Sequence, residues 1–447
     1  MKKRSRAKIS QCMIVKNEEK NIEKALSWGK GVVSEQIVVD TGSTDRTVEL
    51  AEKMGAKVYH FEWIDDFSAA KNFAISKAKY EWIALLDADE YFSEEDAKKL
   101  LFYIRQLNDS KYDIIATAWV HINNDGRVIA VGTQTRIFRN HPGLRYKNRI
   151  HEQIVPIDGR PHPPVDATTE LSIFHTGYGE AENEVKTSSG RNLKMIEAEL
   201  VDRPDDYDML GYLGDELYSM HRLEEAKEAF HKAIALMPES LPEHDMRSDI
   251  TFVKLLEILA YQFLQDDKEI LSVYNDAVKR LPKESDFDYM IGKYYAARGE
   301  FDKGEKYLKL ALQKLEQFGY TSKAMMLTAQ LSKAYELLSV CCYNNGNLKG
   351  CVDYTTALLK TDKYLMSTLY LMLTAFKIDE SAGIEGGTRA SDVVAFLGRN
   401  LYDFTNLKDR LFVLKAAMKA EYATLVEGVR ALFTPEELQS VDRALNV

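Results

Sequence analysis

The chain is poor in cysteine, with only Cys12, Cys341, Cys342 and Cys351 among its 447 residues. No two of them have the CxxC spacing of a zinc site, and their placement does not suggest a disulfide framework. We therefore expect ordinary buried thiols rather than a structural metal or a set of disulfides.

Long apolar runs and an excess of positive charge are also missing. The basic start MKKRSRAK is followed by ISQCMIVKNEE, whose apolar part is too short for a signal peptide or a spanning helix. A net charge of -10 provides no basic field to attract nucleic acid or anionic lipid. These absences predict a cytoplasmic protein with no membrane span and no nucleic-acid partner.

The composition is that of a folded globular protein. Hydrophobic residues make up 45% of the chain and charged residues 29%, a balance that disordered chains do not have. A chain of 447 residues is long enough for two or three domains, each with its own core.

The N-terminal part alternates short apolar runs with stretches of helical spacing, which is the pattern of βαβ units. Because the strand residues are nearly all apolar, we expect a mainly parallel sheet that is buried on both faces. Ligands of such sheets bind beyond the carboxyl ends of the strands, where Asn17, Asp40 and Asp87 fall. The expected strands cover 9–15, 35–40, 57–61 and 82–86, and the expected helices cover 19–29, 45–54 and 67–78.

Over residues 113–177 the pattern changes to shorter β-like pieces, IIATAWVHI, RVIAVG and TRIFRN, separated by Gly, Pro and Asn turns. These pieces complete the same domain, and beyond Glu180 helical patterns follow one another. We therefore expect an α/β, Rossmann-like domain over 1–180, a linker or helix over 181–205, and an all-α repeat domain over 206–447.

The helical part contains a weak internal repeat of the tetratricopeptide (TPR) type. Ile258, Gly292 and Leu338 take the place that Gly214 has in the first unit, and Ile258 and Gly292 are 34 residues apart, the tetratricopeptide period. A helix pair cannot bury its apolar face alone, so we expect the pairs to stack. An irregular helical bundle is the alternative. The matching small positions are Ala277, Ala311 and Ala357.

The stretch WIALLDADEYF brings two carboxylates, Asp87 and Asp89, to the end of an apolar strand. Carboxylate oxygens suit Mg²⁺ or Mn²⁺, and Mg²⁺ is usually held by one or two carboxylates together with substrate phosphates. A metal ion at this strand end would neutralise a diphosphate leaving group. An acidic triplet on a solvated loop is the plainer alternative, and the buried strand before it argues against that.

Two further stretches resemble helix starts. VVDTGSTDRT predicts a helix with Ser43 or Thr44 as its N-cap and Asp45 in its first turn. In EWIDDFSAAKN, the Asp-Phe-Ser order favours Asp66 as an N-cap over a second metal-binding pair.

The ordered motifs ISQCMIVKNEEKNIEKAL, IVVDTGSTDRTVELAEKMGAKVYHFEW, DDFSAAKNFAI and WIALLDADEYF resemble glycosyltransferase family 2 with the GT-A fold. The resemblance covers about residues 1–180. Within the family, the sequence most resembles the branch that includes lipooligosaccharide β-1,4-glucosyltransferases. It also extends to the sublancin-type peptide S-glycosyltransferases of glycocin biosynthesis, which join such a domain to a helical repeat region.

The resemblance implies a nucleotide-sugar site with Asp87 and Asp89 on the metal ion. The sequence departs from the family at Thr41, where many members have a second acid. This difference affects the expected contact with the base, and with it the expectation that the nucleotide is UDP. The donor site would include Val15 and Asn17 by the nucleotide, Asp40 at the uracil or ribose, and Lys71, Asn72 and Asp87 near the diphosphate or sugar.

The segments after residue 130 offer candidates for acid-base chemistry. An inverting transfer needs a general base near the acceptor nucleophile, and Glu152 and His151 in RIHEQIV are the candidates. His175 resembles the histidine segment that ends the GT-A domain in related enzymes, where it completes the metal site or contacts the diphosphate. Phosphate charge could be balanced by Arg136, Arg139 and Arg149.

The sequence thus predicts a metal-dependent glycosyltransferase that uses Mg²⁺ or Mn²⁺ and transfers a sugar, with inversion, from a UDP-sugar to Cys, Ser or Thr of a peptide or protein. The repeats would hold the acceptor. If they form a homodimer instead, a glycan or lipid-linked acceptor is equally sensible. Two other classes stay open: a repeat-based binding protein with a vestigial transferase domain, and a nucleotidyltransferase, whose Gly-rich phosphate loop is missing from MIVKNEEKN.

Overall fold

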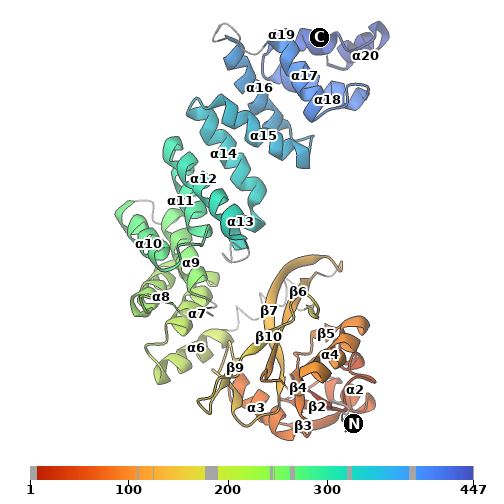
Figure 1. The fold of residues 1–447 in the computed structure, drawn as a ribbon, viewed down its shortest axis with the longest axis vertical. Helices are drawn as coiled ribbons and strands as arrows, with labels where there is room; N and C mark the ends of the chain where they lie inside the picture. Colours follow the sequence, from red (N-terminus) through yellow and green to blue (C-terminus); the bar gives the residue numbers. More distant parts are fainter. Residues whose placement is uncertain are drawn as a thin grey trace. The chain divides into compact units, whose positions relative to one another are not determined.

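The computed structural model describes residues 8–107, 110–123, 125–176, 190–241, 245, 247–261, 267–319, 325–381 and 389–445. The chain forms two compact units, Met1–Ala226 and Lys227–Val447 (Figure 1). The first unit contains the sheet and the first helices of the helical region, and the unit boundary falls inside a helix. Of the expected linker over 181–205, residues 181–189 lie outside the described residues.

The first unit is built on a mixed, mostly parallel sheet with the order β3-β2-β1-β4-β7-β6-β11-β5, and β10 pairs with β6. The pairs β1–β2, β2–β3 and β1–β4 are parallel, whereas β7 runs antiparallel to both β4 and β6. A separate antiparallel hairpin consists of β8 and β9. The strands are β1 Ile9–Val15, β2 Glu35–Asp40, β3 Lys57–His60, β4 Trp82–Leu85, β5 Glu90–Phe92, β6 Ile114–Ile122, β7 Val128–Arg139, β8 Leu144–Lys147, β9 Gln153–Pro156, β10 Pro164–Asp166 and β11 Ser172–His175.

Helices cover both faces of this sheet. Alternation along β4 shows the two sides: Trp82 and Ala84 join a core cluster with α4, whereas Ile83 and Leu85 join a cluster with α3. The residues of β4 are fully buried, as expected for a central strand between two helical layers. The helices are α1 Ile22–Ser27, α2 Thr47–Lys53, α3 Phe67–Lys77 and α4 Glu94–Leu107.

The predicted strands over 9–15 and 35–40 are confirmed as β1 and β2, while three local predictions need correction. The helix predicted over 19–29 is shorter, because α1 begins at Ile22. The N-cap predicted at Ser43 or Thr44 is wrong, since α2 begins at Thr47. The pieces RVIAVG and TRIFRN form one strand, β7. The predicted N-cap at Asp66 is confirmed, because its side chain accepts a hydrogen bond from the Ala69 amide.

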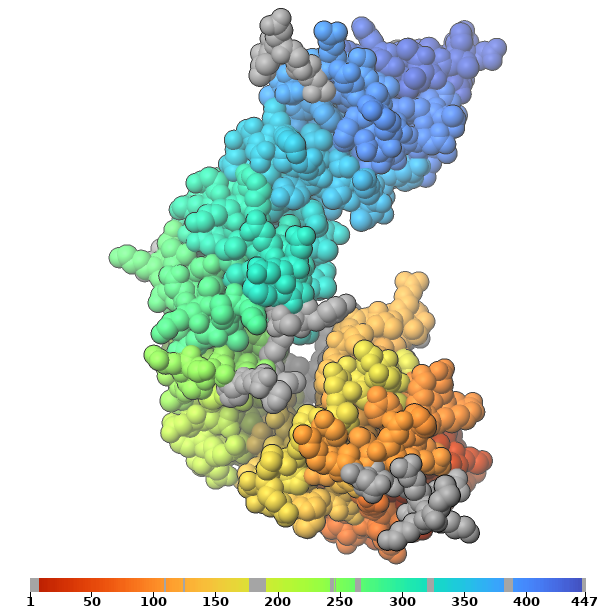
Figure 2. Space-filling view, viewed as in Figure 1, coloured from red at the N-terminus to blue at the C-terminus, as the bar shows by residue number. Residues whose placement is uncertain are grey.

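The rest of the described chain consists of helices joined by short turns. In the second unit, successive helices pack against one another in series, as α11 with α12 and α14 with α15 do, and Figure 2 shows these helices in continuous contact along the colours from green to blue. The helices are α6 Arg191–Asp202, α7 Tyr207–Ser219, α8 Leu223–Leu236, α9 Ser248–Tyr261, α10 Asp267–Arg280, α11 Asp286–Ala297, α12 Phe301–Phe318, α13 Met325–Ala329, α14 Leu331–Asn344, α15 Leu348–Thr361, α16 Met366–Ser381, α17 Ala390–Asn400, α18 Leu407–Lys419, α19 Ala423–Arg430 and α20 Pro435–Leu445.

The burial of the repeat positions fits tetratricopeptide-like packing. Gly292 allows the close approach of α12, because a Cβ there would lie 2.7 Å from Cγ of Leu308. Ala277 and Ala311 are fully buried, whereas Ala357 is only half-buried, so the last repeat packs differently at that position.

The four cysteines are buried free thiols, as predicted. Burial raises the pKa of the thiols of Cys341, Cys342 and Cys351 to about 12. Among the described residues, no helix is long and apolar enough to cross a membrane.

Candidate active site

The first unit contains a cleft of about 380 Å³ beyond the carboxyl ends of β1, β2 and β4. The cleft combines acidic, basic and aromatic side chains from strands, helices and loops of the first unit. Its lining consists of Ile14, Val15, Lys16, Glu18, Thr41, Trp63, Phe67, Lys71, Asp87, Ala88, Asp89, Trp119, Arg136, Glu152, His175 and Arg191.

Asp87 lies between two cations. Its Oδ1 is 3.1 Å from Nζ of Lys71 on α3, and its Oδ2 is 2.5 Å from a guanidinium nitrogen of Arg136 on β7. Burial by itself would raise the pKa of this carboxyl group, but Arg136 and Lys71 outweigh it and hold the pKa well below its usual range. Asp87 is therefore an anion whose charge the protein already balances.

Glu90, on β5, is a buried acid that the sequence analysis did not select. Its carboxylate accepts hydrogen bonds from Arg136, at 3.0 Å, and from the Asp87 amide, at 2.9 Å. Burial raises the pKa of Glu90, although Arg136 acts in the opposite direction. Glu90 thus holds Arg136 and the backbone of the Asp-Ala-Asp turn in place.

Asp89 lies beside His175, with Oδ2 and Nε2 3.2 Å apart. The pairing of β5 with β11 brings them together: His175 is the register partner of Glu90, and the Thr176 amide donates to the Asp89 carbonyl. The other ring nitrogen of His175, Nδ1, is 3.1 Å from Nδ1 of His121 on β6. Burial would lower the pKa of His175, but the hydrogen bond to Asp89 raises it.

The two candidates for the general base lie in different surroundings. The carboxylate of Glu152 lines the cleft, and its Oε1 is 2.6 Å from Nζ of Lys71. His151 has a positive φ of 52°, and its ring stacks on Tyr212 of α7 with centroids 3.6 Å apart. His151 is not among the residues that line the cleft, so the geometry favours Glu152.

The predicted nucleotide residues fall into two groups. Val15 lines the cleft, as does Thr41. Asn17 and Asp40 instead fix the turn between β2 and α2. Asn17 Oδ1 accepts a hydrogen bond from the Thr44 amide at 2.8 Å, and Asp40 accepts from the amides of residues 42 and 43.

Asn72 connects α3 to the β8–β9 hairpin and does not line the cleft. Its side-chain amide donates to the carbonyl of Tyr146, at 2.9 Å, and accepts from the amide of the same residue, at 3.0 Å. Both hydrogen-bonding ends of the side chain are therefore engaged with backbone.

Replacing Asn72 by alanine is expected to lower the free energy of unfolding by about 1–3 kcal/mol, because two backbone groups lose their partner. Urea unfolding measures this loss. Affinity for the nucleotide, measured by calorimetry, should be unchanged. A stable variant that binds the nucleotide poorly would instead place Asn72 at the diphosphate or sugar, as the family resemblance implies.

Several cleft residues were not selected from the sequence. Trp119 is on β6, where an aromatic residue is typical of a core strand, and its ring lies 5.1 Å from that of His175. Arg191 is the first residue of α6, in the region expected to be a linker or helix. No sequence pattern predicts that these two residues line the same cleft.

The mainly parallel sheet, with an Asp-Ala-Asp turn after β4 and a histidine returning on β11, defines a GT-A-type α/β domain. Residues 10–160 match glycosyl transferase family 2. That part of the chain is a family 2 glycosyltransferase domain, and tetratricopeptide-like helices follow it.

Similarity to curated proteins extends beyond this domain. The chain is 29% identical over 286 residues to the SPbeta prophage-derived glycosyltransferase SunS of Bacillus subtilis (strain 168), a match over 62% of this chain and 64% of that protein. It is 30% identical over 257 residues to a TPR repeat-containing protein of Synechococcus elongatus, over 56% and 62% of the two chains. The chain thus covers less than two thirds of each relative. Residues 1–349 of S. aureus TarS align over 69% of this chain and 91% of that one, with 13% identity and a TM-score of 0.32.

Proposed function

We propose that the protein is a metal-dependent glycosyltransferase that moves a sugar from a UDP-sugar to a Cys, Ser or Thr side chain of a peptide or protein. The observation that supports this most is the division of charge in the cleft. Asp87 is paired with two cations, while Asp89 and His175 lie together as ligands of a kind that binds a divalent ion.

The spacing of Asp89 and His175 fits an ion ligand pair. Two ligands about 2.1 Å from one ion, at a right angle, are about 3.0 Å apart, and Oδ2 and Nε2 here are 3.2 Å apart. Asp89 and His175 would hold Mg²⁺ or Mn²⁺, with Asp87 next to them. The ion would supply Lewis-acid stabilisation of the negative charge on the departing diphosphate.

The donor nucleotide would lie over Val15 and Thr41. Behind it, Asn17 and Asp40 fix the turn at residues 41–44 through hydrogen bonds to backbone amides. Asp40 would address the uracil or ribose from that turn. Because Thr41 replaces an acid that many family members have, specificity for UDP remains a prediction.

Glu152 would act as the general base. Lys71 engages its Oε1, so the carboxylate is held towards the cleft and its Oε2 would take the proton of the acceptor. As the acceptor atom bonds to the anomeric carbon, the bond from that carbon to the diphosphate oxygen breaks, and its electron pair leaves with UDP. Attack opposite to the leaving group gives inversion.

The helical repeats would bind the acceptor. Stacked helix pairs form extended surfaces suited to peptides, and the match to SunS, over 286 residues, is longer than the family 2 domain. A glycan or lipid-linked acceptor, with the repeats forming a homodimer, is the alternative. A cytoplasmic location stays a prediction.

A chain truncated to residues 1–240 is expected to retain donor hydrolysis but to lose at least about tenfold in kcat/KM for the acceptor, the factor equivalent to about 1.4 kcal/mol of acceptor binding. This end point is chosen to keep α6 and α7. Their residues Met195, Ile196 and Met209 form a core cluster with Ile150 of the first domain, which would lose its partners if the helices were removed. An end at residue 180, where the sequence predicts the end of the first domain, falls outside the described residues and would remove those helices. Full transfer by residues 1–240 would contradict an acceptor-binding role.

The direct test of the function is a donor screen on the full chain. Each nucleotide sugar is incubated with Mn²⁺, with Mg²⁺ or with a chelator, and with peptides that contain Cys, Ser or Thr. Mass spectrometry should show peptides heavier by one sugar residue only with UDP-sugars and a metal ion. If none of the sugar nucleotides is turned over under any condition, the result would instead favour a binding protein with a vestigial transferase domain.

A further inference from the structure

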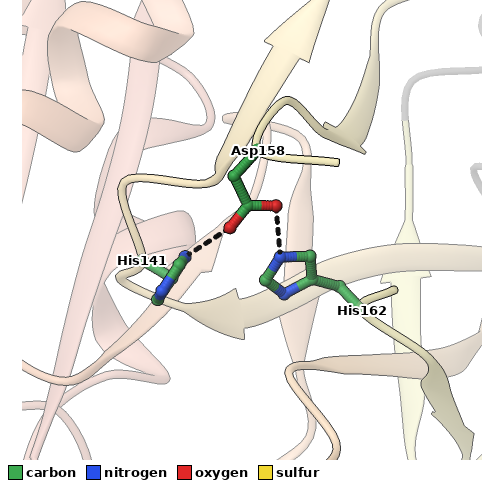
Figure 3. A group of neighbouring side chains, drawn as sticks. All are labelled: His141, Asp158 and His162. Carbon is green, nitrogen blue, oxygen red and sulfur yellow. Dashed lines mark hydrogen bonds and ion pairs between the residues drawn. The ribbon is translucent and has the colours of Figure 1, made fainter. Parts of the chain in front are cut away.

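A second group of metal-ligating side chains lies outside the cleft. His141 is in the turn between β7 and β8, and Asp158 and His162 are in the loop between β9 and β10. Figure 3 shows the two rings directed towards the Asp158 carboxylate from opposite sides. We propose that these three residues form a binding site for a divalent transition-metal ion, Zn²⁺ above all, that is separate from the cleft.

The distances between the side chains suit a common ion. Ligand atoms about 2.1 Å from a tetrahedral Zn²⁺ are about 3.4 Å apart. Here the Asp158 carboxylate is 3.1 Å from Nε2 of His162 and 3.9 Å from Nδ1 of His141, which brackets that value. The three ligand atoms all lie within 4.8 Å of one another. Two imidazoles and one carboxylate also make a known type of zinc site, with water as the fourth ligand.

The orientation of His162 is that of a metal ligand. Its Nδ1 is 2.7 Å from Asp113, so Nδ1–H donates to that carboxylate and the neutral ring presents a lone pair at Nε2. That lone pair faces the Asp158 carboxylate, and a neutral imidazole cannot donate two hydrogen bonds. An ion between Nε2 and Asp158 would bind both groups, and the His162 side chain is only 4% exposed.

Gly143 leaves room for this group. A Cβ at that position would lie 2.2 Å from Oδ2 of Asp158 and 2.8 Å from Nδ1 of His141. Any larger residue would push both side chains away from the centre. The Gly143 amide now donates to Nδ1 of His141 at 2.9 Å, and this hydrogen bond would give way to the ion. Asp158 also accepts from Arg160, whose exposed guanidinium can move aside.

The ion would stabilise the fold and take no part in transfer. None of its three ligands lines the cleft. They lie at the end of the β8–β9 hairpin where the Ile157 amide donates to the Gly143 carbonyl. The opposite end of the hairpin leads to Glu152. A bound ion would therefore fix the hairpin that carries the proposed base.

The test uses the full chain with Asp89→Asn, so that the cleft does not contribute a metal site. After treatment with a chelator, Zn²⁺ is titrated by calorimetry. We expect one Zn²⁺ per chain and a higher Tm. Both should be lost in His141→Gln and in Asp158→Asn, and Asp113→Asn should weaken binding about 10–100-fold.

The matched control is His231→Gln, on α8, where the ring pairs with Glu269 outside this group; it should leave Zn²⁺ binding unchanged. Circular dichroism of the metal-free variants checks that each is folded. His141 is the primary target because its side chain is 33% exposed, whereas His162 is buried. Absence of Zn²⁺ binding, or equal binding by folded His141→Gln and Asp158→Asn variants, would overturn the proposal.

Discussion

Asp89→Asn is expected to lower metal-dependent sugar transfer by about 10³-fold or more, because an amide is a poor ligand for a hard cation and several kcal/mol of charge stabilisation are lost. The fold should stay intact. Asp89 lies at a strand end with its side chain 23% exposed, so its replacement leaves no cavity in the core. Initial rates over a series of Mn²⁺ concentrations measure the effect.

The control for this substitution is Asp353→Asn. Asp353 is on α15, is largely exposed, and pairs with Lys349, so its variant should retain full activity. If Asp89→Asn shows near-normal turnover at saturating Mn²⁺, Asp89 is not a metal ligand, and the account of the cleft is wrong.

Glu152→Gln should cut transfer by about 10² to 10⁴, the range for losing a general base, while nucleotide affinity stays the same. The carboxamide keeps the shape of the side chain but cannot take the proton. Lys71 would still pair with Asp87, so the cleft should keep its arrangement. Steady-state kinetics gives the rate, and calorimetry with UDP gives the affinity.

The neighbouring His151 provides the comparison. His151→Gln should reduce transfer far less, because its ring stacks on Tyr212 and does not line the cleft. Glu62→Gln, at an exposed acid before α3, should have no effect. A larger loss in His151→Gln than in Glu152→Gln would exchange their roles, and an equal loss of UDP binding in Glu152→Gln would indicate a structural role.

Local patterns predicted much of the fold, because the spacing of apolar residues indicates whether one or both faces of a helix or strand are buried. β1 and β2 have the predicted bounds for this reason. α1 begins later than predicted, and the amides of Glu18 and Glu19 before it bond to the side chains of Thr47, the first residue of α2, and of Asp45.

β7 shows how pairing can override a turn signal. Gly132 ends the piece RVIAVG and resembles a break, yet it stays in the strand as the register partner of Trp119. A Cβ at Gly132 would meet the Trp119 ring at 3.8 Å. The signal for a continuous strand therefore lies in β6, not in β7 itself.

The acids of the cleft were predictable from β4, whereas their partners were not. Asp87 and Asp89 directly follow an apolar strand. Glu90 is buried on β5, which pairs with β11, a contact between residues far apart in sequence. Lys71 reaches Asp87 through the packing of α3, and no spacing in the sequence records that distance.

The most direct test of the central claim is a crystal structure of the full chain with UDP and Mn²⁺, with anomalous data collected at the manganese edge. The account predicts UDP in the cleft over Val15 and Thr41, and an anomalous peak about 2.1 Å from a carboxylate oxygen of Asp89 and from Nε2 of His175. A nucleotide bound elsewhere, or a cleft manganese ion without Asp89 among its ligands, would contradict it.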